Sequence, residues 1–224
     1  GTLKVFFQPA EERVAGGGPM SRSPLIDDVD YLYAVHIGLD HPTGEIVAGV
    51  GGFLAASGFD VEFRGTSAHA GARPEAGDNA IQAMAEAITS MYAIPRHSEG
   101  STRVNAGVVE GGTASNIIAE EASMEAEVRG STTELMEYMW EESGTVIQAA
   151  AEMHGVTAER IRHSRAPSAE SDEELAQFIA EAAATVEGVD SILDHDDLGG
   201  SEDATYLMNA VQENGGLACY IGLG

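Results

Sequence analysis

The stretch Phe59-Asp60-Val61-Glu62-Phe63-Arg64 alternates between apolar and charged side chains, and it decides the fold of the middle of the chain. Alternation with a period of two is typical of a strand with one buried face and one face in water. Two later stretches, 104–108 and 122–128, alternate in the same way. A helix is expected between the first two strands, another over about 132–154, and a last strand over 156–161.

This order, β-α-β-β-α-β, is the split βαβ, ferredoxin-like pattern, and it predicts a self-contained unit over 56–166. The flanking segments, 1–55 and 167–224, hold short strands, turns and two helices. Because a domain inserted at a loop tip is well tolerated, we expect one α/β domain that is interrupted by the ferredoxin-like unit.

Two carboxylates follow directly on the first apolar run of the chain. The run over 3–7 predicts a strand, and Glu11 and Glu12 come just after it. Ligands bind at the carboxyl ends of strands in open α/β sheets, so a site is expected at this edge. A second apolar run closes on His36, and a Glu12–His36 pair suits Zn²⁺ or a similar ion. A solvated acidic turn and a core histidine are the alternatives, but the two strand ends together favour a metal site.

Two loops of small residues at strand ends of the middle unit also carry polar side chains. The loop 65–71 has His69 near its centre, and an imidazole can donate a hydrogen bond to an oxyanion. The loop 111–116 ends at Asn116, whose amide can donate two hydrogen bonds. A flexible hairpin with an incidental histidine and an ordinary Gly/Asn turn are the alternative interpretations of these two loops.

The charge of the chain excludes several classes of partner. Its 37 acidic and 11 basic residues give a net charge of -26, which repels nucleic acid and anionic membranes. No apolar stretch reaches the ~18 residues of a membrane helix. The single cysteine, Cys219, is expected in the core and fits a reducing cytosol, which predicts a cytoplasmic protein. The acids are spread along amphipathic segments, so we expect a halophile's protein whose folding depends on salt.

Five motifs, in order along the chain, resemble the M20 family of metallopeptidases and amidohydrolases, in its aminoacylase and auxin-conjugate hydrolase branch. They are Phe7–Glu12, Ala34–His36, Ser67–Ala70, Gly111–Ile118 and Gly199–Asp203. The stretches 70–75, 92–97 and 199–204 are more similar to the A-type subunits of p-aminobenzoyl-glutamate hydrolases. The resemblance implies a zinc-peptidase-like catalytic domain, present in part as 1–55 and 167–224, and a satellite domain over 56–166 that mediates dimerisation.

The resemblance also implies a division of roles among the candidate residues. Two divalent metal ions, zinc or manganese, would hold a bridging water. Glu11 would be the general base, and Glu12 and His36 would be metal ligands. His69 would reach into the partner subunit's active site to stabilise the tetrahedral intermediate, and Asn116 would help to bind the substrate.

Arg129, at the end of the third strand of the middle unit, is a weaker candidate. Its guanidinium could pair with a carboxylate of the substrate. The alternative is a surface arginine that faces Glu127 or Glu125 on the same strand.

The function that the resemblance implies is metal-dependent hydrolysis of the amide bond of an N-acyl amino acid similar to aminobenzoyl-glutamate. The protein would act as a homodimer through the satellite domain, or as a heteromer with a related subunit. Family members also carry an upstream metal motif and a histidine ligand near the C-terminus that this sequence lacks, so we expect a piece of a longer protein. A catalytically incomplete dimerisation scaffold and a dipeptidase of the same family are the alternatives.

Overall fold

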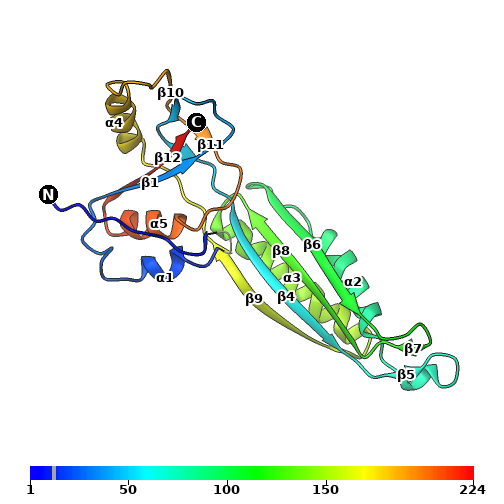
Figure 1. The fold of residues 1–224 in the computed structure, drawn as a ribbon. Helices are drawn as coiled ribbons and strands as arrows, with labels where there is room; N and C mark the ends of the chain where they lie inside the picture. Colours follow the sequence, from blue (N-terminus) through cyan, green and yellow to red (C-terminus); the bar gives the residue numbers. More distant parts are fainter. Residues whose placement is uncertain (12–13) are drawn as a thin grey trace. The chain divides into compact units, whose positions relative to one another are not determined.

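The computed structural model describes residues 1–11 and 14–224, which form a mixed α/β fold (Figure 1). The chain divides into two compact units. The first consists of Gly1–Ala55 and Ala166–Gly224, and the second of Ala56–Arg165. The predicted metal ligand Glu12 lies outside the described residues.

The second unit has a four-stranded sheet in the order β6-β8-β4-β9. Its main elements follow one another in the predicted β-α-β-β-α-β order: β4 (Ala55–Arg64), α2 (Ala80–Tyr92), β6 (Thr102–Gly111), β8 (Glu121–Gly130), α3 (Thr133–Met153) and β9 (Thr157–Ala166). The two helices cover one face of the sheet (Figure 1). The loops at one end carry a small ribbon of β5 (Ala68–His69) and β7 (Ile117–Ile118), and a 3-10 turn, η2 (Pro74–Ala76).

Local sequence explains where these elements start and which face is buried. Phe59, Val61 and Phe63 of β4 are fully buried, because period-two alternation directs them to the helix-covered face. Asn79 caps the N-terminus of helix α2, and its side chain accepts hydrogen bonds from the backbone N–H of Ile81 at 3.1 Å and of the next residue at 3.3 Å. Such a cap satisfies backbone N–H groups that have no partner within the helix.

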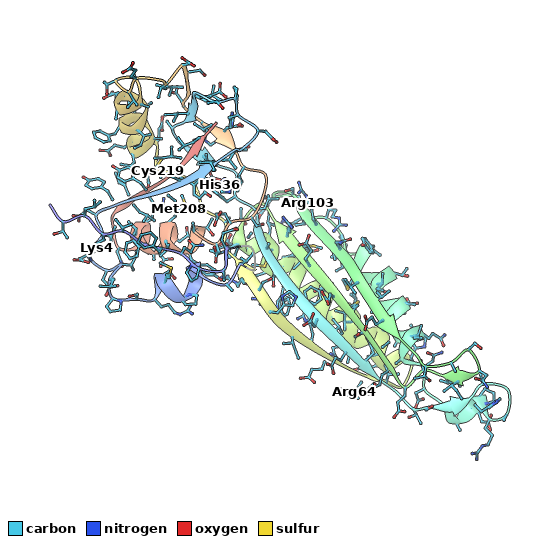
Figure 2. All side chains as sticks on the ribbon, in the orientation of Figure 1. Lys4, His36, Arg64, Arg103, Met208 and Cys219 are labelled. Carbon is cyan, nitrogen blue, oxygen red and sulfur yellow. The ribbon has the colours of Figure 1, made fainter. Side chains whose placement is uncertain are left out.

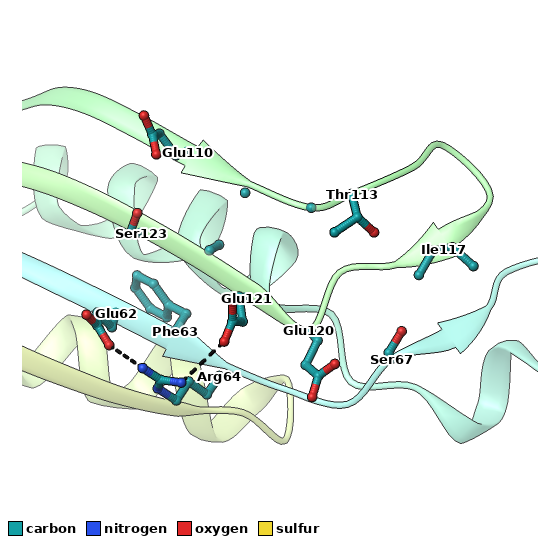
Figure 3. A pocket seen from close by; sticks show the side chains of 13 residues that line it. Glu62, Phe63, Arg64, Ser67, Glu110, Thr113, Ile117, Glu120, Glu121 and Ser123 are labelled. Carbon is teal, nitrogen blue, oxygen red and sulfur yellow. Dashed lines mark hydrogen bonds and ion pairs between the residues drawn. The ribbon is translucent and has the colours of Figure 1, made fainter.

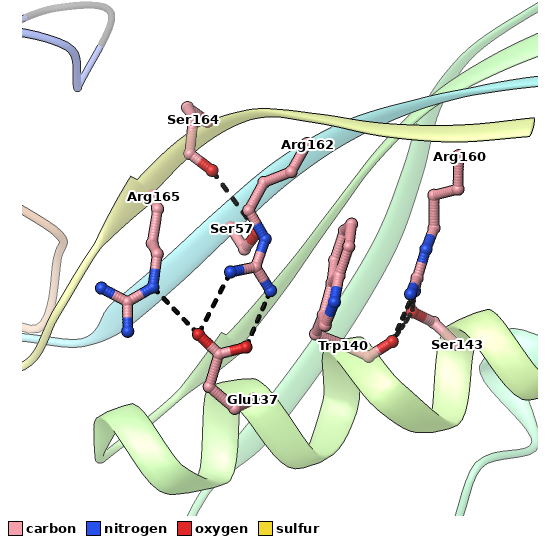
Figure 4. A network of polar contacts seen from close by, with 8 residues as sticks. All are labelled: Ser57, Glu137, Trp140, Ser143, Arg160, Arg162, Ser164 and Arg165. Atoms are coloured by element: carbon pink, nitrogen blue, oxygen red, sulfur yellow. Dashed lines mark hydrogen bonds and ion pairs between the residues drawn. The ribbon is translucent and has the colours of Figure 1, made fainter.

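The edge strand β9 is joined to α3 by a polar network instead of an apolar layer (Figure 4). The guanidinium carbons of Arg160 and Arg162 lie 3.5 and 3.9 Å from the ring centroid of Trp140, one on either side of the indole. Glu137 accepts hydrogen bonds from Arg162 and Arg165. Stacked cations and a shared carboxylate let the long side chains of an edge strand pack over an aromatic ring.

The first unit has two sheets. In the larger one the order is β1-β12-β2-β10, in which β1 and β12 are parallel, β12 and β2 antiparallel, and β2 and β10 parallel. Strands β3 and β11 form a parallel pair. The elements of this unit are α1 (Gly17–Ser21), β1 (Tyr31–Ile37), β2 (Glu45–Val47), β3 (Val50–Gly51), α4 (Glu173–Ala183), β10 (Ser191–Leu193), β11 (Asp196–Asp197), α5 (Thr205–Glu213) and β12 (Leu217–Leu223).

The core of the first unit lies between the larger sheet and α5. Tyr220 and Met208 belong to its main cluster of buried residues, and their elements are shown in Figure 1. Cys219 is fully buried on β12, as predicted, and its thiol donates to the carbonyl oxygen of Ala48 at 2.9 Å (Figure 2). Burial raises the pKa of this thiol above its ordinary value. In the part of the chain that the structure describes, no helix is long and apolar enough to cross a membrane.

The strand predicted over 3–7 is wrong, since this segment belongs to no sheet among the described strands. The alternation itself is present. Phe6 packs against the core, and Lys4 pairs with Asp28, whereas Leu3 and Phe7 are 89% and 86% exposed. Apolar alternation predicts which side chains share a face, but a strand also needs a partner for its backbone groups, and a local sequence pattern does not specify that partner.

Candidate functional site

Three acidic side chains meet in the first unit. One ligand atom from each of Glu11, Glu202 and Asp203 lies within 4.8 Å of the other two. Glu202 and Asp203 are buried, and Glu11 is half-buried. The predicted base is thus brought to two carboxylates that lie about 190 residues further along the chain.

Both buried carboxylates have specific hydrogen-bond donors. Asp203 Oδ2 accepts from the backbone N–H groups of Gly16 at 2.8 Å and Gly17 at 2.7 Å, and its Oδ1 accepts from the Gln8 side chain. Glu202 Oε1 accepts from its neighbouring backbone at residue 204 at 3.0 Å, and Oε2 accepts from the Tyr220 hydroxyl at 2.9 Å. Both side chains are therefore held in place by donors of the protein itself.

Tyr220 connects this carboxylate group to the predicted ligand His36. It lies on β12, beside β1, in the register that pairs Ala34 with Tyr220 and His36 with Gly222. The rings of Tyr220 and His36 are stacked, with centroids 6.5 Å apart. Burial first, and then the nearby charge of Glu202, raise the pKa of Tyr220 far above its ordinary value, so its hydroxyl remains a donor.

His36 lies near the carboxyl end of β1, where the sequence predicted it, and its side chain is exposed (Figure 2). Its Nδ1 lies 2.8 Å from the carbonyl oxygen of Ile37. Because a carbonyl oxygen only accepts hydrogen bonds, Nδ1 must carry the proton, and Nε2 then presents a lone pair. Metal-binding histidines typically use one ring nitrogen as the ligand while the other donates in this way.

These residues therefore fit a divalent metal in chemical type. Carboxylate oxygens and a neutral imidazole nitrogen are donors that zinc and manganese accept. His36 does not belong to the three-carboxylate group among the described residues, and Glu202 and Asp203 already have hydrogen-bond donors on both oxygens. The fit therefore depends on His36, whose Nε2 can be the ligand, because Glu202 and Asp203 are held by donors of the protein.

His69 and Asn116 meet in the second unit. His69 pairs with Ile117 across the β5–β7 ribbon, and the backbone N–H of Ala70 donates to the carbonyl oxygen of Asn116 at 2.9 Å. Both side chains are exposed. The backbone N–H of Gly71 donates to His69 Nδ1 at 3.1 Å, so the proton of a neutral ring is on Nε2, which can donate to another group.

Arg129 has the surface environment given as the alternative in its prediction. Its guanidinium donates to both carboxylate oxygens of Glu127, at 3.0 and 2.9 Å. Across the sheet it faces a second cation, Arg103. A bidentate partner on its own strand occupies the fork that a substrate carboxylate would need.

An open pocket lies in the second unit, at the end of the sheet near the ribbon (Figure 3). Arg64 lies in it between Glu62 and Glu121, with which it forms ion pairs at 2.6 and 3.3 Å. Ser67 and Ile117, neighbours of His69 and Asn116, also line it. Its lining belongs to a different unit from Glu11 and His36.

A comparison with known proteins identifies the relatives of the chain. Residues 55–155 match the family model of the M20 peptidase dimerisation domain. The indole-3-acetyl-aspartic acid hydrolase of Enterobacter agglomerans and the A-type subunit of the p-aminobenzoyl-glutamate hydrolase of Escherichia coli are each 40% identical over 225 residues, which is all of this chain. The chain belongs to the M20 family.

The M20 chain spans about half the length of these curated relatives, 52% of each. Among solved structures, an aminobenzoyl-glutamate utilization protein from Klebsiella pneumoniae is 40% identical, with a TM-score of 0.91 over 97% of this chain and 55% of that one. A dinuclear metal-binding M20 peptidase from Bacillus subtilis shares the fold at 23% identity, with a TM-score of 0.69 over 97% of this chain and 54% of that one.

Sequence reasoning gave no role to Glu202, Asp203 or Tyr220. The sequence indicates Gly199–Asp203 only as a motif, and it gives no signal for Tyr220. Their importance depends on contacts with Glu11, His36 and the segment before α1, which lie far away in the sequence.

Proposed function

We propose that this M20 chain forms part of a metal-dependent amidohydrolase that cleaves the amide bond of N-acyl amino acids, with aminobenzoyl-glutamate-like compounds as substrates. Two relatives at 40% identity are named as hydrolases of such conjugates. The observation that carries the proposal is the approach of Glu11 to Glu202 and Asp203, close to the strand end that bears His36.

In this proposal Glu12 and His36 are ligands of two divalent ions, zinc or manganese. Bound ions would lower the pKa of a water molecule toward neutrality and polarise the amide carbonyl. Glu11 would take the proton of that water as the water oxygen bonds to the amide carbon, and would return it to the amide nitrogen as the C–N bond breaks.

His69 and Asn116 would complete the site from a second subunit. The Nε2 donor of a neutral His69 suits an oxyanion, and the exposed Asn116 beside it suits a polar substrate group. The match to a dimerisation domain supports assembly through Ala56–Arg165, either as a homodimer or with a related subunit. Arg129 is a weak candidate for the substrate carboxylate, because Glu127 already binds it in bidentate fashion.

The test is Glu11→Gln, which preserves shape and removes the base. Its matched control is Glu187→Gln, an exposed glutamate of the same unit. Both variants are prepared in this chain and in the longest product of its gene, and hydrolysis of aminobenzoyl-glutamate, hippurate and dipeptides is measured. We expect Glu11→Gln to lower turnover by roughly 10²–10⁴-fold, the usual contribution of a general base. Metal affinity by calorimetry should change little, and turnover within a few fold of the parent would refute the assignment of Glu11.

A dimerisation scaffold is the second candidate, and one observation favours it. The matched family model is a dimerisation domain, and the chain spans about half of its hydrolase relatives. A scaffold of this kind should give a dimer in sedimentation experiments and no tight, stoichiometric heat of binding when zinc or manganese chloride is added. Tight binding of either ion to this chain would exclude it.

A further inference from the structure

We propose that Asp203 is a positioning residue for Glu11, because its carboxylate binds the chain on both sides of Glu11, at Gln8 and at Gly16 and Gly17. The inference rests on the proposed function, since Glu11 matters as a base only if the protein is the hydrolase described above. The described residues of the segment from Gln8 to Gly17 are 8–11 and 14–17, and both of its ends bind the carboxylate of a residue about 190 positions further along the chain.

The two oxygens of Asp203 hold different ends of the segment. Oδ1 accepts from the Gln8 side-chain amide, before Glu11. Oδ2 accepts from two consecutive backbone N–H groups, of Gly16 at 2.8 Å and Gly17 at 2.7 Å, after Glu11. The side chain is fully buried, so these bonds are not replaced by water, and a charged acceptor makes them stronger than bonds between neutral groups.

The backbone of the segment is shaped for this closure. A Cβ on Gly16 would lie 1.7 Å from the carbonyl oxygen of Pro9, and one on Gly17 would lie 1.9 Å from that of Asp203. Only glycine permits such close approach. The N–H of Ala15 also donates to the carbonyl oxygen of Ala10 at 3.2 Å, so a backbone hydrogen bond joins the residues on either side of Glu11 as well.

This arrangement explains why a buried charge is present in the unit. Without the Asp203 carboxylate the N–H groups of Gly16 and Gly17 would lose their acceptor, and Gln8 would lose its anchor. Glu11 would then sample many positions, whereas a base acts efficiently only from a fixed geometry relative to the water it deprotonates. Asp203 acts through the segment and is not itself a base.

The test compares Asp203→Asn and Gln8→Ala with the matched control Asp172→Asn. Asp172 is also a carboxylate of this unit that accepts from a backbone N–H, of Ala218 at 2.7 Å, and from a side-chain amide, of Gln212 at 2.8 Å. Hydrogen exchange of the whole chain is followed by amide-resolved mass spectrometry, a readout that needs neither metal nor activity. Turnover and KM are measured in parallel on the longest gene product.

In Asp203→Asn we expect the amides of Gly16 and Gly17 to exchange about tenfold faster or more, as loss of a hydrogen bond to a charged acceptor implies. In Gln8→Ala the amide of Ala15 should exchange faster while Gly16 and Gly17 remain protected. The control should increase exchange at Ala218 and leave the segment unchanged. If the protein is the proposed hydrolase, both segment variants should lower kcat with little change in KM.

Unchanged protection of residues 15–17 in Gln8→Ala and Asp203→Asn would overturn the proposal. So would faster exchange in Asp203→Asn that is uniform over the unit, since that pattern indicates general destabilisation. If Asp203→Asn does not fold, the result for Gln8→Ala decides, because this variant removes only the hydrogen bond between Gln8 and Asp203. If the parent protein has no hydrolase activity but the variants show the expected exchange pattern, the proposed function is rejected. The positioning role of Asp203 is then still supported.

Discussion

Tyr220→Phe removes one hydroxyl from the centre of the candidate site, and its effect on stability can be worked out from the structure. The side chain is 3% exposed, and its hydroxyl donates to Glu202 Oε2 at 2.9 Å. Phenylalanine keeps the ring that packs edge-on against Phe53 at 5.0 Å and stacks on His36. The variant therefore isolates the hydrogen bond and leaves the apolar packing in place.

A hydrogen bond to a charged group contributes about 1.5–3 kcal/mol, and the buried Glu202 oxygen is left without this donor. We expect the free energy of unfolding to fall by that amount, measured by urea denaturation followed by circular dichroism in multimolar KCl. The control is Tyr31→Phe, on an exposed tyrosine of β1, which should change stability by less than about 0.5 kcal/mol. A Tyr220→Phe variant as stable as this control would refute the argument that the hydroxyl stabilises Glu202.

Charge and packing lead to three further predictions. With a net charge of -26, the melting temperature should rise between dilute buffer and multimolar KCl, and an unchanged value would reject the halophilic interpretation. Burial alone would raise the pKa of Glu137, but Arg162 and Arg165 bring it below its ordinary value of 4.5. Its contribution to stability is therefore present above pH 4.5 and lost as the pH falls through the depressed pKa, so Glu137→Gln should flatten the acid limb of a stability–pH curve. Arg160→Ala removes the cation 3.5 Å from the Trp140 ring and should cost about 0.5–2 kcal/mol, measured by unfolding followed through the fluorescence of this single tryptophan.

The secondary structure of the second unit was largely predictable because its signals are local. Period-two alternation in 59–64 and 122–128, and the helical spacing that follows each of these stretches, are properties of neighbouring residues, and they place β4, β8, α2 and α3 correctly. The order of the helices and strands along the chain is then known, because it is the order in which these local patterns occur. The prediction over 3–7 was wrong for the complementary reason, since a strand needs a partner that local pattern does not supply.

The candidate site was predictable only in its residue types. The sequence identified Glu11 and His36 from their places at the ends of apolar runs, and His69 and Asn116 from loops of small residues. It left open whether Arg129 faces substrate or its own strand, and the structure shows a bidentate hydrogen bond to Glu127. The roles of these residues in hydrolysis remain predictions.

The sequence by itself determined the charge of the molecule, the order of its elements and the side chains that could carry chemistry. Only the tertiary structure decided which of them meet. Asp203 binds the side chain of Gln8, which lies 195 residues earlier in the sequence. Tyr220 lies between Glu202 and His36 because β12 pairs with β1. Such contacts depend on the packing of distant elements, and buried polar groups make them obligatory because no water is available to replace the missing partner.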